Sequence, residues 1–413
     1  MRIKKVAHSK ILAIVLAGGK GERLYPLTAH RAKPAVHFGG IYRLIDFVLS
    51  NLVNSGIHSI YIFTQYKAQS LLNHLQSGWV TTSTIDNSFI LPVPAQMRLG
   101  ETWYLGTADA VYQNTYLIRR FKPDLVCIFG ADHVYFMDVS QMINYHIEKG
   151  AEATVATIPY PILECKRFGV VIIDKEWRII EFQEKSPEPT PMPDQPDKGL
   201  VSMGNYIFNT EVLLEELAED ASNPKSSHDF GRDILPNICK KRRVYAYDFT
   251  KNKVPGIVGD NKYWRDVGTI STYYEANMDL KNPLPQLNLY NSLWPIHSIK
   301  YHGTPAKIVV DDYGNAGHVE NSLIASGSII SGACVRDSII GPNVFIKSRA
   351  LVEGSIIMKD VVIEEDARIR RAIIDDYNII KRGEHIGYDP NKDMERFYVD
   401  PDSGIVVVPR PAD

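Results

Sequence analysis

The stretch ILAIVLAGGKGERL, residues 11–24, joins an apolar run to a glycine-rich segment. The apolar part, 11–17, predicts a buried parallel strand that runs directly into a loop. The glycines at 18, 19 and 21 allow that loop's backbone to approach a ligand with no Cβ in the way. Lys20 and Arg23, with Lys33 in the RAKPAVHFGG segment that follows, offer ammonium and guanidinium groups suited to phosphate oxygens. The pattern predicts a nucleotide-binding loop.

Two common glycine motifs do not fit this loop. The phosphate-binding loop of NTPases ends in Gly-Lys-Ser/Thr, and the dinucleotide fingerprint needs a third glycine where this chain has Leu24. A purely structural turn is the alternative for a glycine-rich segment after a strand. The basic residues that accompany the glycines favour a nucleotidyl-transfer loop over that alternative.

The first part of the chain alternates short apolar runs with amphipathic stretches, up to about residue 244. This alternation predicts an α/β, Rossmann-like nucleotidyltransferase domain with a mostly parallel sheet and helices on both faces. We assign this domain to residues 1–282 and a proline-containing and aromatic linker to residues 283–317. Ligands of such sheets bind at the carboxyl ends of the strands.

The C-terminal part repeats aliphatic residues every five or six positions from Val319 to Ile386. One column is Val335, Val352, Ile369 and Ile386, each 17 residues apart, and a second runs through Ile330, Ile346, Ile363 and Ile380. A hexapeptide repeat with three turns per coil predicts a left-handed parallel β-helix, which we assign to residues 318–413.

Composition limits the classes of function. The chain has 413 residues, a formal net charge of -2 and a pI near 6.6, so no basic surface for nucleic acid is indicated. Its 4 cysteines have no CxxC spacing, which predicts reduced thiols and a cytoplasmic location. The basic start before the apolar run imitates a signal peptide, but we interpret the run as the first strand. No stretch is long and apolar enough for a membrane span.

Two carboxylates follow short apolar stretches at positions suited to metal binding: Asp132 in GADHVY and Asp266 in YWRDVGT. If they converge, they can hold Mg²⁺, which bridges phosphate oxygens and neutralises developing charge. Each alone could equally be a cap or a salt-bridge partner. The adjacent Glu184 and Lys185 could bind sugar hydroxyls and a sugar phosphate, although an exposed Glu-Lys pair is usually only solvated.

The chain resembles the bacterial glucose-1-phosphate adenylyltransferases, or ADP-glucose pyrophosphorylases, over nearly its whole length. The matching motifs are LAGGKGERL, RAKPAVHFGG, LIDFVLSN, NSGI, TQYKAQSL, WYLGTADAVYQN, ADHVY, RFGV, SMG, SSHDFGRDILP and YWRDVGT. The resemblance implies synthesis of ADP-glucose and pyrophosphate from ATP and glucose 1-phosphate, toward glycogen. It also implies a homotetramer that is controlled by phosphorylated allosteric effectors.

The resemblance also implies roles for individual residues. Asp132 and Asp266 hold Mg²⁺, and Arg23 and Lys33 contact the nucleotide phosphates. Further nucleotide positions are Leu16, Gly18, Gly19, Gln96, Gly106 and Thr107. The glucose 1-phosphate positions are Tyr104, Gly169, Glu184, Lys185 and Ser202. The effector positions are His30, Arg31, His37, Arg43 and Arg120.

Some positions depart from the family pattern. Ala131 replaces the usual glycine before the catalytic aspartate, Ser186 replaces a proline, and Asn205 replaces an aliphatic residue. Asp376 occupies a position that is frequently basic, where a carboxylate is expected to repel a phosphate. The alternatives are a transferase that uses UTP or dTTP, a non-catalytic regulatory paralogue, and a β-helix acyltransferase. The acyltransferase alternative is not favoured, because the repeat columns contain no histidine suited to deprotonating an amine.

Overall fold

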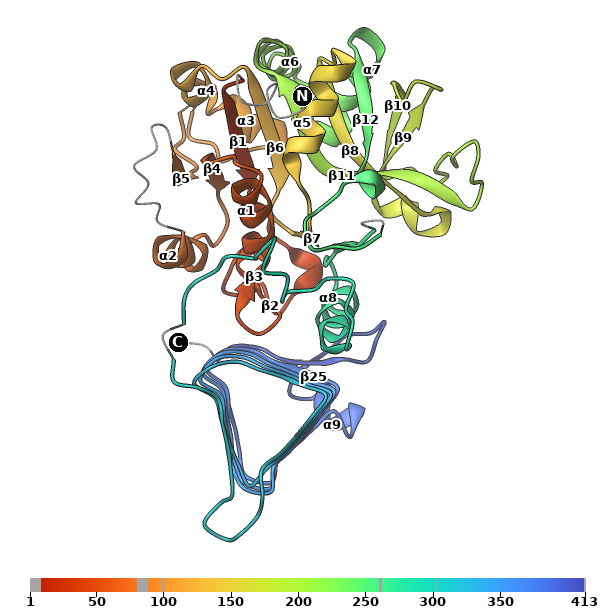
Figure 1. Ribbon diagram of the computed structural model, residues 1–413. Helices are drawn as coiled ribbons and strands as arrows, with labels where there is room; N and C mark the ends of the chain where they lie inside the picture. The colour runs from red at the N-terminus through yellow and green to blue at the C-terminus, as the bar shows by residue number, and fades with distance from the viewer. Residues whose placement is uncertain (1–8, 80–87, 99, 260–261, 302, 412–413) are drawn as a thin grey trace.

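The computed structural model describes residues 9–79, 88–98, 100–259, 262–301 and 303–411. An α/β domain occupies the upper part of Figure 1, and a prism with a triangular cross-section lies below it. Residues 1–8, which include the basic part of the signal-like start, lie outside the described residues. The apolar run forms strand β1 (Ile11–Leu16), as the sequence predicts.

A nine-stranded sheet forms the centre of the α/β domain, with the main order β10-β9-β11-β6-β1-β4-β5, while β8 pairs with β11 and β12. Besides β1, its strands are β4 (Ser59–Thr64), β5 (Phe89–Pro94), β6 (Leu125–Gly130), β8 (Ala153–Pro161), β9 (Gly169–Ile173), β10 (Ile179–Glu184), β11 (Lys198–Asn209) and β12 (Val244–Asp248). The pairings of β1 with β4 and β6, and of β4 with β5, are parallel. Only β10 and β11 run against the others. The prediction of a mostly parallel sheet is therefore confirmed.

Helices cover both faces of the sheet. Successive residues of a strand point to opposite faces, and apolar residues at both sets of positions make both faces apolar. Ala13 and Val15 of β1 belong to one buried cluster, whereas Leu12 and Ile14 belong to another. The first face is covered by α1 (Leu44–Asn54), α2 (Gln69–Gly78) and α5 (Val139–Lys149). The second is covered by α3 (Thr107–Tyr112), α4 (Thr115–Phe121), α6 (Thr210–Ala221) and α7 (Leu235–Lys241).

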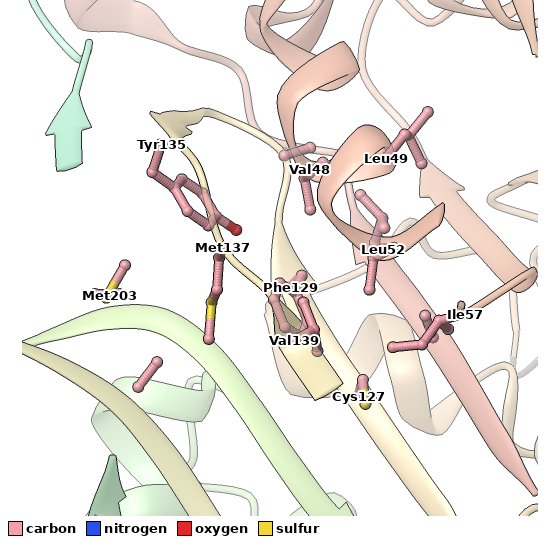
Figure 2. Packing of buried hydrophobic residues seen from close by; sticks show 14 of the residues in the cluster. Val48, Leu49, Leu52, Ile57, Cys127, Phe129, Tyr135, Met137, Val139 and Met203 are labelled. Atoms are coloured by element: carbon pink, nitrogen blue, oxygen red, sulfur yellow. The ribbon is translucent and has the colours of Figure 1, made fainter. Parts of the chain in front are cut away.

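Figure 2 shows how α1 packs on the sheet. Val48 and Leu52 extend from this helix toward the side of β6 that carries Cys127 and Phe129, and Leu49 belongs to the same buried cluster. All five side chains are at most 1% exposed. This packing holds α1, and with it the preceding segment that carries Lys33, against the strands whose ends form the site.

Short elements surround the carboxyl ends of the central strands. They are η2 (Glu22–Leu24), η3 (Lys33–Ala35), β2 (His37–Phe38), β3 (Tyr42–Arg43), β7 (His133–Tyr135), η4 (Ile162–Arg167), the π-helical turn η5 (Phe230–Ile234), η6 (Phe249–Lys251), β13 (Trp264–Asp266), α8 (Ile270–Met278) and η7 (Asp279–Lys281). Most of them are too short to be evident from periodicity.

The prism is a parallel β-helix with three sheets, as predicted. Its strands are β14 (Lys307–Val309), β15 (His318–Glu320), β16 (Leu323–Ile324), β17 (Ile329–Ser331), β18 (Cys334–Arg336), β19 (Ile339–Ile340), β20 (Phe345–Ile346), β21 (Leu351–Glu353), β22 (Ile356–Ile357), β23 (Val362–Ile363), β24 (Arg368–Arg370), β25 (Ala372–Ile374), β26 (Ile379–Ile380), β27 (His385–Ile386), β28 (Tyr398–Val399) and β29 (Val406–Val408), with α9 (Pro390–Met394) near its end. Val335, Val352, Ile369 and Ile386 are in direct register, which confirms the first repeat column. The second column is confirmed in the same way.

The β-helix begins before residue 318, the boundary that the repeat indicates. Strand β14 lies inside the predicted linker and pairs in parallel with β17. Ile308, in the middle of β14, is 48% exposed. Because this strand lies at an open end of the prism, it lacks the fully buried aliphatic residue that marks later coils.

An apolar cluster joins the two domains. Leu44 and Phe47 of α1 belong to the same buried cluster as Met358, Ile373 and Val407 of the β-helix. The two domains therefore share a core. Within the described ranges, none of the helices has both the length and the apolar character needed to cross a bilayer.

Replacing Ile380 by alanine is expected to destabilise the protein by about 2–4 kcal/mol, because its side chain is 3% exposed and fills the prism. Its neighbour Ile379, on the same strand, is 63% exposed and provides the matched control. Ile379→Ala should change the free energy of unfolding by no more than about 0.5 kcal/mol. Urea denaturation of both variants measures the difference, and equal effects would contradict the inward orientation of Ile380.

Candidate active site

A cleft of about 880 Å³ opens at the carboxyl ends of β1, β4 and β6. Its wall includes Leu16 and Gly130, the last residues of β1 and β6, and Gln65, which directly follows β4. The glycine-rich loop forms one side, and Glu184 with Lys185 lies on another. This is the edge at which parallel sheets bind ligands.

Lys33 lies between the two carboxylates predicted to bind metal. Its Nζ is 2.9 Å from Oδ2 of Asp132 and 3.1 Å from Oδ1 of Asp266. The lysine is 6% exposed, so its ammonium group depends on these carboxylates to balance its charge. The structure thus brings together three residues that come from widely separated segments of the chain.

A short two-stranded ribbon explains how Asp266 reaches Asp132. Strand β13 pairs antiparallel with β7, and Asp266 stands directly opposite His133. Side chains of directly opposed residues in an antiparallel pair lie on the same face of the ribbon. Because Asp132 immediately precedes β7, this register places both carboxylates at one end of the ribbon, beside Lys33.

The ammonium group and the carboxylates stabilise each other's charged forms. Burial alone would raise the pKa of Asp132, but Lys33 and His133 more than offset burial and hold that pKa well below its usual range. Burial alone would lower the pKa of Lys33, and the two carboxylates instead hold it above its usual value. Asp132 and Lys33 are therefore charged at neutral pH.

The glycine-rich loop packs closely on the Lys33 segment. Gly21 has φ +67°, and a Cβ at this position would lie 2.8 Å from Cβ of Lys33. Both the left-handed conformation and the close approach require glycine here. The loop then places Arg23 with Nη2 3.9 Å from Oδ2 of Asp266, while its side chain remains 58% exposed toward the cleft. Arg23 is thus available to an anionic ligand.

The residues beside Lys33 have the chemistry of a divalent metal site. Ligand atoms of Asp132, His133 and Asp266 lie within 4.8 Å of one another. Nδ1 of His133 is buried and has no hydrogen-bond partner among the described residues. Two carboxylates with one imidazole can hold a divalent cation.

Glu184 and Lys185 form the opposite wall of the cleft. Nζ of Lys185 is 2.9 Å from Oε1 of Glu184, and the lysine side chain is 54% exposed. Gly169 and Gly231 enclose the carboxylate, because a Cβ on either would lie within 2.9 Å of Oε2 of Glu184. Ser202 is 8% exposed, and its Oγ accepts a hydrogen bond from the backbone N–H of Gly204.

A third wall is built around Tyr104 and the start of α3. The backbone N–H of Tyr104 donates to Oε1 of Gln65 at 2.8 Å, and Gln65 Nε2 donates to the Tyr104 carbonyl at 3.3 Å. Thr107 Oγ1 donates to Asp229 at 2.9 Å. Gly106 cannot carry a side chain, since its Cβ would lie 2.3 Å from the carbonyl oxygen of His228.

Most of the predicted substrate residues line this one cleft. They are Leu16, Gly18, Gly19, Arg23, Lys33, Tyr104, Gly106, Thr107, Asp132, Glu184 and Lys185. Asp266 joins them through Lys33, and Gly169 through Glu184. Gln96 is exposed after β5 and does not line the cleft. Gln65, His133 and Asp229 also line the cleft, although the sequence pattern did not indicate them. Gln65 directly follows β4, and the carboxyl end of a parallel strand is where a ligand-binding residue could have been sought.

The five basic residues assigned to effectors are not all close together. Arg31 and His37 are buried at the domain junction, where both bond to Asp376. Arg43 lies near them, with its Nη1 bound to Ser70. His30 is exposed. Arg120 is on α4, which Figure 1 places at the end of the α/β domain remote from the β-helix.

Comparison with known proteins agrees with the two-domain fold. The nucleotidyl transferase family matches residues 12–283, and the GlmU-like C-terminal hexapeptide family matches residues 304–408. The glucose-1-phosphate adenylyltransferase of Thermodesulfovibrio yellowstonii is 48% identical over 98% of this chain and 97% of its own length. The protein of that name from Thermus thermophilus is 49% identical over 97% and 98%. The chain belongs to the nucleotidyl transferase family and, within it, to the glucose-1-phosphate adenylyltransferases.

Asp132→Asn is expected to lower kcat by about 10²-fold or more, because a neutral amide cannot balance the Lys33 ammonium or hold a metal beside a triphosphate. The same variant should weaken binding of Mn²⁺, measured by electron paramagnetic resonance without substrate. Asp312→Asn, at an exposed carboxylate of the β-helix domain, is the control. A folded Asp132→Asn enzyme with more than about a tenth of wild-type activity would exclude the catalytic assignment.

Proposed function

We propose that this protein transfers the adenylyl group of ATP to glucose 1-phosphate, in the cytoplasm, and so supplies ADP-glucose for α-glucan synthesis. The observation that carries the proposal is the position of Lys33 between Asp132 and Asp266, on the floor of the cleft. The glycine-rich loop and the Glu184–Lys185 pair form the walls of the same cleft. Family membership supports the choice of substrates.

In the proposed reaction, a phosphate oxygen of glucose 1-phosphate attacks the α-phosphorus of ATP. The new oxygen–phosphorus bond forms as the bond to the bridging oxygen of pyrophosphate breaks, and pyrophosphate leaves. The nucleophile is already an anion near neutral pH, so no side chain is needed as a base or covalent intermediate. Position and charge neutralisation suffice for such a step.

The cleft residues have separate tasks in this proposal. Lys33 and Arg23 donate to oxygens of the triphosphate, and the buried ammonium of Lys33 acts where little water screens it. Glu184 accepts from sugar hydroxyls, and Lys185 pairs with the sugar phosphate. Asp132 and Asp266 would hold Mg²⁺, which when bound neutralises charge on the transferring phosphoryl group.

The resemblance supports two further parts of the proposal. We propose a homotetramer whose activity responds to phosphorylated effectors at Arg43 and its basic neighbours. Titrating the wild-type enzyme with glycolytic phosphates and AMP tests this part, and no response to any of them would contradict it. A silent regulatory subunit is disfavoured, because Arg23, Lys33 and both carboxylates are present and lie together.

A nucleotide panel tests the choice of substrates. With glucose 1-phosphate and Mg²⁺, the purified protein should release pyrophosphate fastest from ATP, and the product should be ADP-glucose by mass spectrometry. Faster turnover with UTP or dTTP would replace the adenylyl assignment by the corresponding one. No turnover with any nucleotide would favour the non-catalytic alternative.

Lys185→Ala should raise the KM for glucose 1-phosphate by about tenfold or more and leave the KM for ATP nearly unchanged, because the lysine contacts only the sugar phosphate in this proposal. Lys175→Ala, at an exposed lysine outside the cleft, is the matched control and should change neither constant. Equal increases for both substrates would show that Lys185 does not act as the sugar-phosphate clamp.

A further inference from the structure

The segment that carries Lys33 is fixed at both ends to the β-helix. Arg31 precedes Lys33 by two residues and His37 follows it by four, and both side chains bond to Asp376. Asp376 and its neighbour Asp375 directly follow strand β25 of the prism. A pair of carboxylates in the β-helix thus contacts side chains on both sides of Lys33, the central cation of the active site in the α/β domain.

The Arg31 guanidinium makes the main contact across the junction. Its Nη2 is 2.9 Å from Oδ1 of Asp375 and 3.2 Å from Oδ2 of Asp376. Arg31 is 3% exposed, and the two aspartates are 2% and 6% exposed. Its Nη1 also lies 3.9 Å from Sδ of Met358, from a preceding coil. An ion pair buried to this degree is costly to break by removing one partner, since a charge is then left unbalanced.

His37 forms the second contact. Its Nε2 is 3.1 Å from Oδ2 of Asp376, and because a carboxylate oxygen only accepts, Nε2 carries the proton. The carbonyl oxygen of His37 accepts a hydrogen bond of 2.6 Å from the buried Tyr273 hydroxyl of α8. The start of β2 is therefore held from two directions, and the intervening η3 turn with Lys33 has little freedom to move.

The two carboxylates are themselves fixed. Oδ1 of Asp376 accepts from the backbone N–H of Lys359 at 3.2 Å, and the N–H of Asp376 donates to Oδ1 of Asp375 at 2.8 Å. Nδ2 of Asn378 donates to the Asp375 carbonyl at 2.8 Å. The first of these bonds ties Asp376 to the preceding coil, and the other two fix the turn that carries the pair, so the prism can serve as a support for the segment.

We propose that Asp376, together with Asp375, is a positioning residue for nucleotidyl transfer: the β-helix carboxylates hold Arg31 and His37 so that Lys33 stays in its productive place beside Asp132 and Asp266. The inference rests on the function proposed above. Asp376 supplies a fixed anion between the side chains of Arg31 and His37. Misplacing a catalytic cation by about 1 Å can cost two orders of magnitude in rate, so such a support has a measurable effect.

The test is chemical rescue of Asp376→Ala. This variant should lower kcat by about tenfold or more, with KM for ATP and glucose 1-phosphate changed less than about threefold. Added formate should restore part of the lost kcat, because a small carboxylate can enter the space beside Arg31 and His37. Chloride at the same ionic strength should not do so. Formate should have no such effect on the wild-type enzyme.

Asp400→Ala is the control for a general loss of β-helix stability. Asp400 is 7% exposed and accepts hydrogen bonds from Ser403 within the prism domain. It should lower the melting temperature without lowering kcat. An equal fall of kcat in both variants, or a full kcat in Asp376→Ala, would overturn the proposal. So would the absence of formate rescue in a folded Asp376→Ala enzyme.

Asp376→Asn provides a second measurement if the alanine variant does not fold. The amide keeps the shape and removes the charge, so amide hydrogen exchange in residues 31–38 should accelerate relative to wild type, while exchange in β1 should not. Unchanged exchange in 31–38 would overturn the proposal. Wild-type activity separates the two hypotheses: a wild-type protein with no nucleotidyl transfer contradicts the proposed function, whereas an active wild type with an unaffected Asp376 variant contradicts only this inference.

Discussion

The contact of one buried ammonium group with two carboxylates is the constraint on which the site depends. Lys33 comes from the segment before α1, Asp132 from the turn between β6 and β7, and Asp266 from strand β13. A lysine that is 6% exposed is tolerated only where its charge is balanced. The three segments must therefore be in place together, and the sheet order that puts β1 beside β6 makes this possible.

The need to balance a buried charge also connects the α/β domain to the prism. The apolar cluster at the junction includes Phe47, Tyr273 and Ile373, and the Arg31 ion pair at the same junction is almost fully buried. Burial alone would lower the pKa of Arg31, but Asp375 and Asp376 hold it above its usual value. The β-helix thus contributes charge as well as surface to the segment that carries Lys33, which two domains joined only by a linker could not achieve.

The sequence predicts features whose cause is local or periodic. The 17-residue spacing of Val335, Val352 and Ile369 revealed the prism, since each coil repeats one set of inward positions. Features that depend on tertiary pairing were not accessible. Asp266 reaches the site through a three-residue ribbon with β7, too short to show periodicity. The buried Asn205, a departure from the family pattern, donates to the Tyr135 hydroxyl, a partner that its own position in the sequence does not indicate.

Asp376 shows most clearly why charge must be interpreted together with its neighbours. From sequence alone, a carboxylate at this position suggests repulsion of an anionic effector. The structure adds that Asp376 already binds Arg31 and His37, and that burial lowers the pKa of His37 more than Asp376 raises it, so the ring is neutral near pH 7. A phosphate could reach these two side chains only by displacing a carboxylate.

Arg43 makes no ion pair with any described residue, and its Nε has no hydrogen-bond partner among them. Arg43 therefore takes no part in the contact that holds Lys33.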